Sequence, residues 1–451
     1  MKKISFVNLP FNITLVSIFL PLIASYFFIE LHRIILVITV FLFFILFISK
    51  KKKMIFSKSN ILFLFLLLLF MSYDQATGRG LFYFSHSHFI IYIFVFFHCF
   101  LFDENRVSEK LIIRYVSKIY TIFIVFLLVE VLFHVSGNMG LLLNAFGLGP
   151  IESVIPYYRE YHNRFAVAIG LNLGALNSLI LGNQIGSQLN LYAMLWFFPF
   201  YYFIKLPEIF KRSNLWFFIA FILFILSPTM TANVLFIISF FLLVFYIPIS
   251  RINNLKGKIS IVIISVIGFS VMLTYLFPIF FDGSTQVIKT LQVEVPTLGY
   301  YIYGMTYPIF IFNDLPLWEQ IFGRVHQGWA ELGYFKLLIS TGALWVFTMS
   351  IALFVIVFNA FRLSKNINLK EKTPSYSIEL YKKWIWIAQV NAFISLMYFL
   401  SLIHYITINR LGIIQLFSLH IAIAMFATRK AKMLQNNTTD VNINIHKILP
   451  I

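Results

Sequence analysis

Long apolar runs, separated by short basic clusters, are the feature that most constrains how this chain folds. They recur along most of the 451-residue sequence, and a helix needs roughly 17 to 25 mostly apolar residues to cross a bilayer. Hydrophobic residues make up 60% of the chain and charged residues 12%, about half the charged share of a soluble domain. We therefore predict an all-α, polytopic integral membrane protein with about twelve transmembrane helices. The expected spans are 12–30, 34–49, 59–73, 81–102, 118–135, 188–205, 214–228, 233–250, 259–280, 331–360, 384–404 and 411–428.

The distribution of Lys and Arg predicts the side on which each connecting segment lies. Basic residues are enriched in the cytoplasmic loops of membrane proteins. If the N-terminus is cytoplasmic, all but eight of the 35 Lys and Arg residues fall on the cytoplasmic side. An even number of spans then places the C-terminus in the cytoplasm as well. The eight residues left on the outer side are Arg33, Arg79, Arg159, Arg164, Lys289, Arg324, Lys336 and Arg410.

This topology predicts a single transmembrane domain, residues 1–435, followed by a polar cytoplasmic tail, residues 436–451. Two long periplasmic loops are expected, at about 136–187 and 281–330. Within the first loop, segment 165–182 is moderately apolar and either re-enters the membrane or lies along it. If this segment spans the membrane instead, both the span count and the sidedness downstream change.

Other classes of protein fit the charge and cysteine content poorly. A net charge of +18 is compatible with nucleic-acid binding, but the basic residues sit in short clusters between apolar runs. A nucleic-acid-binding protein gathers them on one polar face, so we expect no nucleic-acid partner. The single cysteine, Cys99, excludes an internal disulfide and a cysteine-based zinc site. His98 and His420 lie within apolar runs, and we expect both to be buried in the helix bundle.

The first outer loop contains a short run of candidate ligand-binding residues. Arg159 and Arg164 flank Tyr161 and His162. The planar fork of Arg pairs with phosphate oxygens, and Tyr and His rings stack on sugar faces. The alternative is an interfacial belt in which the Tyr residues sit at headgroup level. Arg164 borders an apolar stretch, where an unpaired charge is costly, which favours a functional role.

The second outer loop ends in a second group of candidates, Arg324, His326 and Glu331. If a helix begins near Gly328, His326 lies just before its N-terminus, where backbone N–H groups favour a bound anion. The same dipole keeps an imidazole neutral, which suits a general base. The alternative is that His326 only caps the helix. Arg410, in the short outer turn before the last span, is either a further phosphate contact or an interfacial anchor.

A family resemblance is carried mainly by the run IFGRVHQGWAELGYFKLLISTGALW, which begins at Ile321. This run resembles the loop-to-helix signature of the O-antigen polymerase and O-antigen ligase superfamily. The Arg164 segment and the hairpin LSPTMTANVLF resemble other parts of that family, although the hairpin lacks an Arg often found there. The matching positions of the main signature are Gly323, His326, Glu331, Tyr334, Phe335 and Gly342.

The resemblance implies a glycosyltransferase acting at the periplasmic face of a bacterial inner membrane. A polymerase of this kind joins undecaprenyl-diphosphate-linked oligosaccharide repeat units. The alternatives are an O-antigen ligase, which uses a lipid A core as acceptor, and a lipid-linked oligosaccharide flippase. Expected partners are the lipid-linked oligosaccharide, membrane lipid and a chain-length regulator.

Each candidate residue has an expected role under this resemblance. His326 is the candidate general base and Glu331 the second choice. Arginines would stabilise the charge that develops on the diphosphate leaving group, and we expect neither a metal nor another cofactor. The diphosphate-binding candidates are Arg164, Arg324, Arg159 and Arg410, and the sugar-binding candidates are Tyr161, His162 and Trp329.

Overall fold

The computed structural model describes part of the chain, and within that part every regular element is a helix. This confirms the predicted all-α class at that level. The described residues are 58–77, 87–101, 104, 107–135, 311–324, 333–363, 375–400 and 413–448, with scattered positions between 12 and 48. The spans predicted at 188–205, 214–228, 233–250 and 259–280, and the loop at 136–187, lie outside the described residues.

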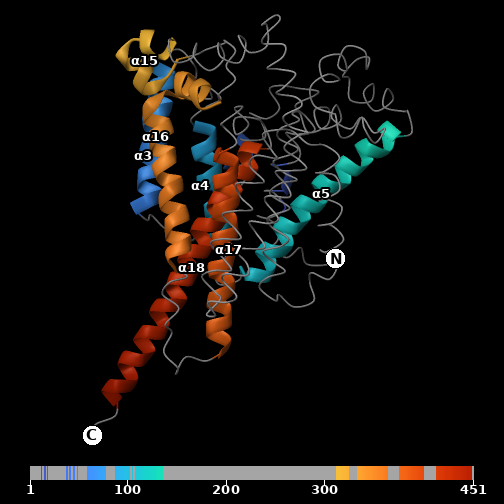
Figure 1. Cartoon of the computed structure of the whole chain (residues 1–451). Helices are drawn as coiled ribbons and strands as arrows, with labels where there is room; N and C mark the ends of the chain where they lie inside the picture. Colours follow the sequence, from blue (N-terminus) through green and yellow to red (C-terminus); the bar gives the residue numbers. More distant parts are fainter. Residues whose placement is uncertain are drawn as a thin grey trace, which may run out of the picture.

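Seven helices are described, and six of them fall on predicted spans (Figure 1). The seventh, α15, lies inside the predicted outer loop 281–330. Several helices extend beyond the apolar stretch that predicted them, and the predicted polar tail begins inside α18. The helices are α3 (Lys58–Ala76), α4 (Ser87–Leu101), α5 (Glu109–Val135), α15 (Leu317–Phe322), α16 (Gly333–Arg362), α17 (Ser375–Leu400) and α18 (Ile413–Ile448).

Helix α18 lies at the centre of the described bundle and packs against both α4 and α17 (Figure 1). The ring of Phe89 on α4 stacks on Phe417 of α18 with 4.9 Å between centroids. Further along both helices, Phe100 approaches Phe426 at 5.6 Å. Because both residue numbers increase together, α4 and α18 run in the same direction. His98 and His420 are 8% and 1% exposed, which confirms that both are buried.

Helix α17 runs opposite to α18 and to α16. Trp384, near the start of α17, packs against Phe426 in the middle part of α18. The hydroxyl of Tyr381, also near the start of α17, donates to the carbonyl of Leu363 just after α16, at 3.3 Å. In the first half of α16, Trp345 packs against Phe89 at the start of α4. Helices α4, α16 and α18 therefore share one direction.

Helix α5 begins nine residues before the predicted span because its first turn is capped outside the apolar stretch. The hydroxyl of Ser108 accepts a hydrogen bond from the backbone N–H of Leu111 at 3.2 Å. Such a cap satisfies an N–H group that has no partner within the helix. Glu109 in the first turn adds a favourable charge at the positive end of the helix dipole. Glu104, just before α5, contacts Arg429 of α18, and Tyr120, later in α5, contacts the earlier His420, so these two helices are antiparallel.

The helix directions gather the described basic residues at one end of the bundle. That end holds the starts of α3, α5 and α17 and the end of α16. Glu104, between α4 and α5, pairs there with Arg429 at 3.8 Å and with Lys430 at 3.7 Å. Of the described basic residues, Arg324 and Lys336 lie toward the opposite end, where α15 is. The basic residues of the first end include Lys58, Lys110, Arg114, Arg362, Lys382, Lys383, Arg429, Lys430 and Lys432.

Two helices expose large apolar side chains along much of their length. On α16, Phe354 is 68% exposed, and its exposed apolar neighbours recur at helical spacing. Among the described residues, one helix, Leu337–Arg362, is long and apolar enough to cross a membrane by length and composition. Leu64–Ala76 and Phe89–Leu101 are shorter apolar helices. The exposed apolar residues are Phe347, Ile351, Phe354, Val355 and Phe358 on α16, and Ile61, Leu62, Phe65 and Leu68 on α3.

Candidate functional site

Helix α16 is broken at Gly342, so the prediction of one continuous helix over 331–360 is wrong at this point. Gly342 has φ 82° and ψ 161°, a conformation that only glycine adopts without strain. A short helix precedes the break, and a longer one continues to Arg362. A break of this kind frees carbonyl groups of the preceding turn from their partners four residues on. These carbonyls need donors from elsewhere in the chain.

One such carbonyl is used by the loop that follows α15. The backbone N–H of Arg324 donates to the carbonyl of Ile339 at 2.8 Å. The N–H of Gly323 donates to the carbonyl of Glu319 at 2.7 Å and closes the last turn of α15. Arg324 is thereby held against the broken helix by its own backbone.

Gly323 and Gly342 make this close approach possible. Gly323 also has a positive φ, 81°. A Cβ added at Gly323 would lie 2.5 Å from the carbonyl oxygen of Ser340 and 2.6 Å from the nitrogen of Gly342. A Cβ added at Gly342 would collide with the carbonyl oxygen of Ile321 and with the nitrogen of Gly323. Gly323 and Gly342 both belong to the run that begins at Ile321. They therefore lie against each other, and the contact between them is backbone against backbone.

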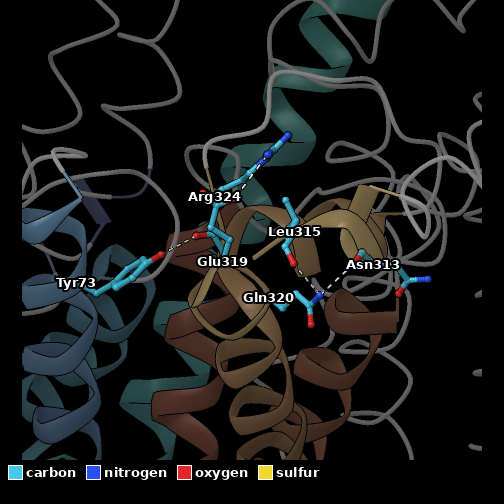
Figure 2. Close-up of polar contacts among 7 residues, drawn as sticks. Tyr73, Asn313, Leu315, Glu319, Gln320 and Arg324 are labelled. Carbon is cyan, nitrogen blue, oxygen red and sulfur yellow. Dashed lines mark hydrogen bonds and ion pairs between the residues drawn. The ribbon is translucent and has the colours of Figure 1, made fainter. Parts of the chain in front are cut away.

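The guanidinium of Arg324 is left available for a ligand. It forms an ion pair with Glu319 at 3.6 Å, and the two side chains are 43% and 35% exposed (Figure 2). Partly exposed pairs of this kind contribute about 0.2–1 kcal/mol, because water competes for both charges. An anionic ligand would therefore compete with Glu319, whose paired oxygen is shielded from solvent, for this guanidinium. A phosphate offers the paired oxygens that the guanidinium fork recognises.

Helix α3 supports the same junction from the side. The hydroxyl of Tyr73 donates to the carbonyl of Gly323 at 3.2 Å (Figure 2). Its ring stacks on Phe322 at 4.6 Å, and Phe322 in turn stacks on Trp318 at 6.4 Å. Asp74, the next residue on α3, is fully buried. The sequence does not predict a role for Tyr73, which is a tyrosine near the end of an apolar run. Its hydrogen-bond partner is 250 residues away in the chain.

The start of α15 is held by a local side chain. The amide of Gln320 donates to the carbonyls of Leu315 at 2.9 Å and of Asn313 at 3.3 Å (Figure 2). These bonds tie the short helix to the turn before it. Pro316 precedes the first helical residue and has no side-chain cap to offer. Gln320 therefore anchors the start of α15 to the residues before it, by donating to their carbonyls.

A second polar group lies deep in the bundle and involves three helices. Nδ1 of His420 lies 2.7 Å from Oδ1 of Asn391, and Nε2 lies 2.5 Å from the hydroxyl of Tyr120. The amide of Asn391 donates to the carbonyl of Ile387 at 2.8 Å, which leaves Oδ1 as an acceptor. Nδ1–H of His420 therefore donates to Asn391, and Nε2 accepts from Tyr120. Ser395 adds a bond to the carbonyl of Asn391 at 2.8 Å.

Of the sequence-predicted site residues, the structure describes Arg324 alone. It lies at the end of the bundle away from most described basic residues. Helix α16 is described from Gly333 onward, and the helix start predicted near Gly328 lies outside the described residues. The candidates outside the described residues are His326, Trp329, Glu331, Arg159, Tyr161, His162, Arg164 and Arg410.

Within the described part of the chain, no group of three or more His, Cys, Asp or Glu side chains could hold a metal ion. No family model, curated protein or solved structure significantly matches this chain. A function for this chain is therefore inferred from its own residues.

Proposed function

We propose that this chain is a multi-pass membrane protein of about twelve spans, with both termini in the cytoplasm and two long periplasmic loops. The exposed apolar faces of α3 and α16 support this proposal, because water-exposed Phe, Ile and Leu in such numbers are unfavourable. The basic residues gathered at one end of the bundle support the orientation, since cytoplasmic ends of spans are enriched in Lys and Arg. The end that carries α15 would then face the periplasm.

Within that membrane protein, we propose a glycosyltransferase of the O-antigen polymerase type in the bacterial inner membrane. It joins oligosaccharide repeat units carried on undecaprenyl diphosphate. The observation that carries the proposal is the position of Arg324. Its backbone is fixed on the broken helix α16 at the outer end of the bundle, while its guanidinium has only a weak partner in Glu319.

The proposed chemistry assigns the diphosphate leaving group to arginine. As the bond between sugar and diphosphate breaks, negative charge grows on the phosphate oxygens. A preorganised guanidinium stabilises that charge more than it stabilises the ground state. Arg324 takes this role, with Arg164, Arg159 and Arg410 as its proposed companions. His326 accepts the proton of the acceptor hydroxyl, with Glu331 as the second candidate.

The proposal also covers the residues that contact the sugars, the need for cofactors and the protein partner. Tyr161, His162 and Trp329 are the proposed sugar contacts, because aromatic rings pack on the apolar faces of sugars. The Arg residues supply the charge stabilisation, so the reaction needs neither a metal nor another cofactor. A chain-length regulator is the proposed protein partner.

Deletion of the gene tests the polymerase assignment directly. We expect lipid A cores that carry a single repeat unit, because one unit can still be transferred without polymerisation. Loss of every repeat would contradict a polymerase and favour the ligase or the flippase. A normal ladder of chain lengths would contradict all three. The measurement is the ladder of surface polysaccharide on a gel.

Arg324→Ala tests the site. We expect polymer formation to fall by roughly 100-fold or more, the loss typical for removal of one preorganised charge-stabilising group. Arg324→Lys keeps the charge but not the fork and should recover only part of the activity. Arg114→Ala is the matched control, because Arg114 is an exposed arginine at the opposite end of the bundle. An Arg324→Ala protein that is present at normal level and makes full-length polymer would remove this residue from the site.

A further inference from the structure

We infer that α15 is a membrane-docking element whose exposed Leu317 and Trp318 lie at the boundary between the headgroups and the acyl chains of the outer leaflet. The inference rests on the membrane part of the proposed function and goes beyond it. It assigns a partner, the lipid surface, to a segment expected from the sequence to be a loop.

The length of α16 locates that boundary. About 20 residues follow the break at Gly342 before the helix ends at Arg362, and at about 1.5 Å per residue they extend about 30 Å. This equals the thickness of a typical hydrocarbon core. The exposed apolar side chains of α16 all lie within this stretch, from Phe347 to Phe358. Gly342 therefore marks one boundary of the hydrocarbon core, and the charged Arg362 marks the other.

Helix α3 gives the same boundary independently. It begins at Lys58 and has 19 residues, which extend about 28 Å. Its exposed apolar residues also lie between its ends, from Ile61 to Leu68. Near its far end, Tyr73 contacts Gly323, the residue packed on Gly342. Two helices with different sequences thus place the junction between α15 and α16 at one level.

The side chains of α15 suit the boundary between the headgroups and the hydrocarbon core. Leu317 is 66% exposed and Trp318 is 68% exposed, although both are large and apolar. Trp is enriched at membrane–water interfaces because its ring is apolar and its N–H is polar. The neighbouring Asn313 and Asp314 are exposed and polar, which suits the aqueous side. Lipid therefore explains why one part of this short segment is apolar and the other polar.

Charge and size also favour lipid over a protein partner. The guanidinium of Arg324, two residues after α15, is partly exposed at the same level, and cationic side chains are favourable near the headgroups. Helix α15 has six residues, whereas a stable protein interface buries about 800 Å² on each partner. A single short turn with two exposed apolar side chains is too small to supply such an interface. It is large enough to lie in a bilayer to which the protein is already fixed.

Depth-dependent fluorescence quenching tests the inference on the full-length protein. Cys99, the only cysteine, is replaced by Ala, and single cysteines are introduced by Leu317→Cys, Phe354→Cys and Glu379→Cys. Each is labelled with an environment-sensitive fluorophore and placed in nanodiscs of phosphatidylcholine and phosphatidylglycerol. The quenchers are lipids with a nitroxide at a shallow or a deep acyl position, and iodide in the water. All three native side chains are exposed, so the label does not enter the core.

The three positions predict three different results. The label at 354 should be quenched by the deep nitroxide, and the label at 379 by iodide. The label at 317 should be quenched most by the shallow nitroxide and several-fold less by iodide than the label at 379. If the label at 317 behaves like that at 379 while 354 stays shielded, the inference is wrong and the membrane proposal stands. If iodide also reaches 354, the membrane proposal itself is wrong.

Discussion

The core around His420 and the junction between α15 and α16 are held by different kinds of contact. In the core, side chains from α5, α17 and α18 satisfy one another through Tyr120, His420 and Asn391. At the junction, Gly323 and Gly342 bring two stretches of backbone together without any side chain between them. The first contact depends on chemical complementarity, and the second depends on the absence of a Cβ.

This difference predicts how each region responds to substitution. Polar side chains in a network can be replaced together by apolar ones, because no group is then left without a partner. A backbone contact has no such compensation, because any side chain enters the space that the neighbouring backbone occupies. The junction also fixes Arg324, so its rigidity serves the proposed site directly. The core network is remote from that site and joins helices.

The largest expected effect comes from Gly342→Ala. The positive φ costs about 1–3 kcal/mol for a residue with a side chain, and the added Cβ collides with the backbone of Ile321. We expect the free energy of unfolding to fall by about 2–4 kcal/mol. Thermal unfolding in detergent measures this loss. Thr348→Ala, further along the same helix, is the control, and equal unfolding temperatures for the two variants would contradict the backbone contact.

Gly323→Ala sharpens the same point. It carries a similar φ penalty and would approach Ser340 and Gly342, so its loss of stability should be comparable. Both variants should also lower polymer formation in the protein that remains folded, because Arg324 follows Gly323 directly. A stable Gly323→Ala protein with full activity would show that the close approach is not needed.

A smaller effect is expected from His420→Leu in the core. This change removes the partner of both Tyr120 and Asn391, and polar contacts inside membrane proteins contribute about 0.6 kcal/mol on average and up to about 1.7 kcal/mol each. We expect a loss of about 1–3 kcal/mol in the free energy of unfolding. Tyr120→Phe should add little further loss in the His420→Leu background. Additive losses in this double-mutant cycle would contradict a direct bond.

The smallest expected effect comes from Glu104→Gln at the basic end. Its contacts to Arg429 and Lys430 are long, 3.8 and 3.7 Å, and all three groups are partly exposed. We expect a loss of at most about 1 kcal/mol, measured by the same unfolding assay. Glu379→Gln is the control: Glu379 pairs with Lys383 at 2.8 Å but is itself exposed to solvent, so its loss should be smaller still.

The pH dependence of Glu104→Gln adds a second readout. Burial lowers the pKa of Lys430, and the Glu104 carboxylate opposes this shift. Without Glu104 the pKa of Lys430 should fall further. At a pH between the folded and the unfolded pKa of Lys430, the unfolded chain binds more protons than the folded protein. The free energy of unfolding should therefore rise with pH in that alkaline range. Because the variant has the lower folded pKa, this range should be wider in the variant than in the parent protein. An unchanged pH profile would contradict the pairing.

The predicted helices follow from local properties of the chain. Apolar runs long enough to bury a helix predicted α3, α4, α5, α16, α17 and α18, because their periodicity and length are visible without tertiary information. His98 and His420 were correctly expected to be buried, since both lie inside such runs. The ends were less accurate. Caps such as Ser108 extend a helix past its apolar stretch, and hydropathy alone does not detect them.

What the sequence determined by itself is the helical class and the separation of charge along the chain, because both are sums over neighbouring residues. Two things were decided only by the tertiary structure: the break at Gly342 and the position of Arg324 on it. A glycine in an apolar run is compatible with a continuous helix. It becomes a break only because the backbone of Gly323 occupies the space beside it, and Arg324 supplies the donor that the broken turn needs.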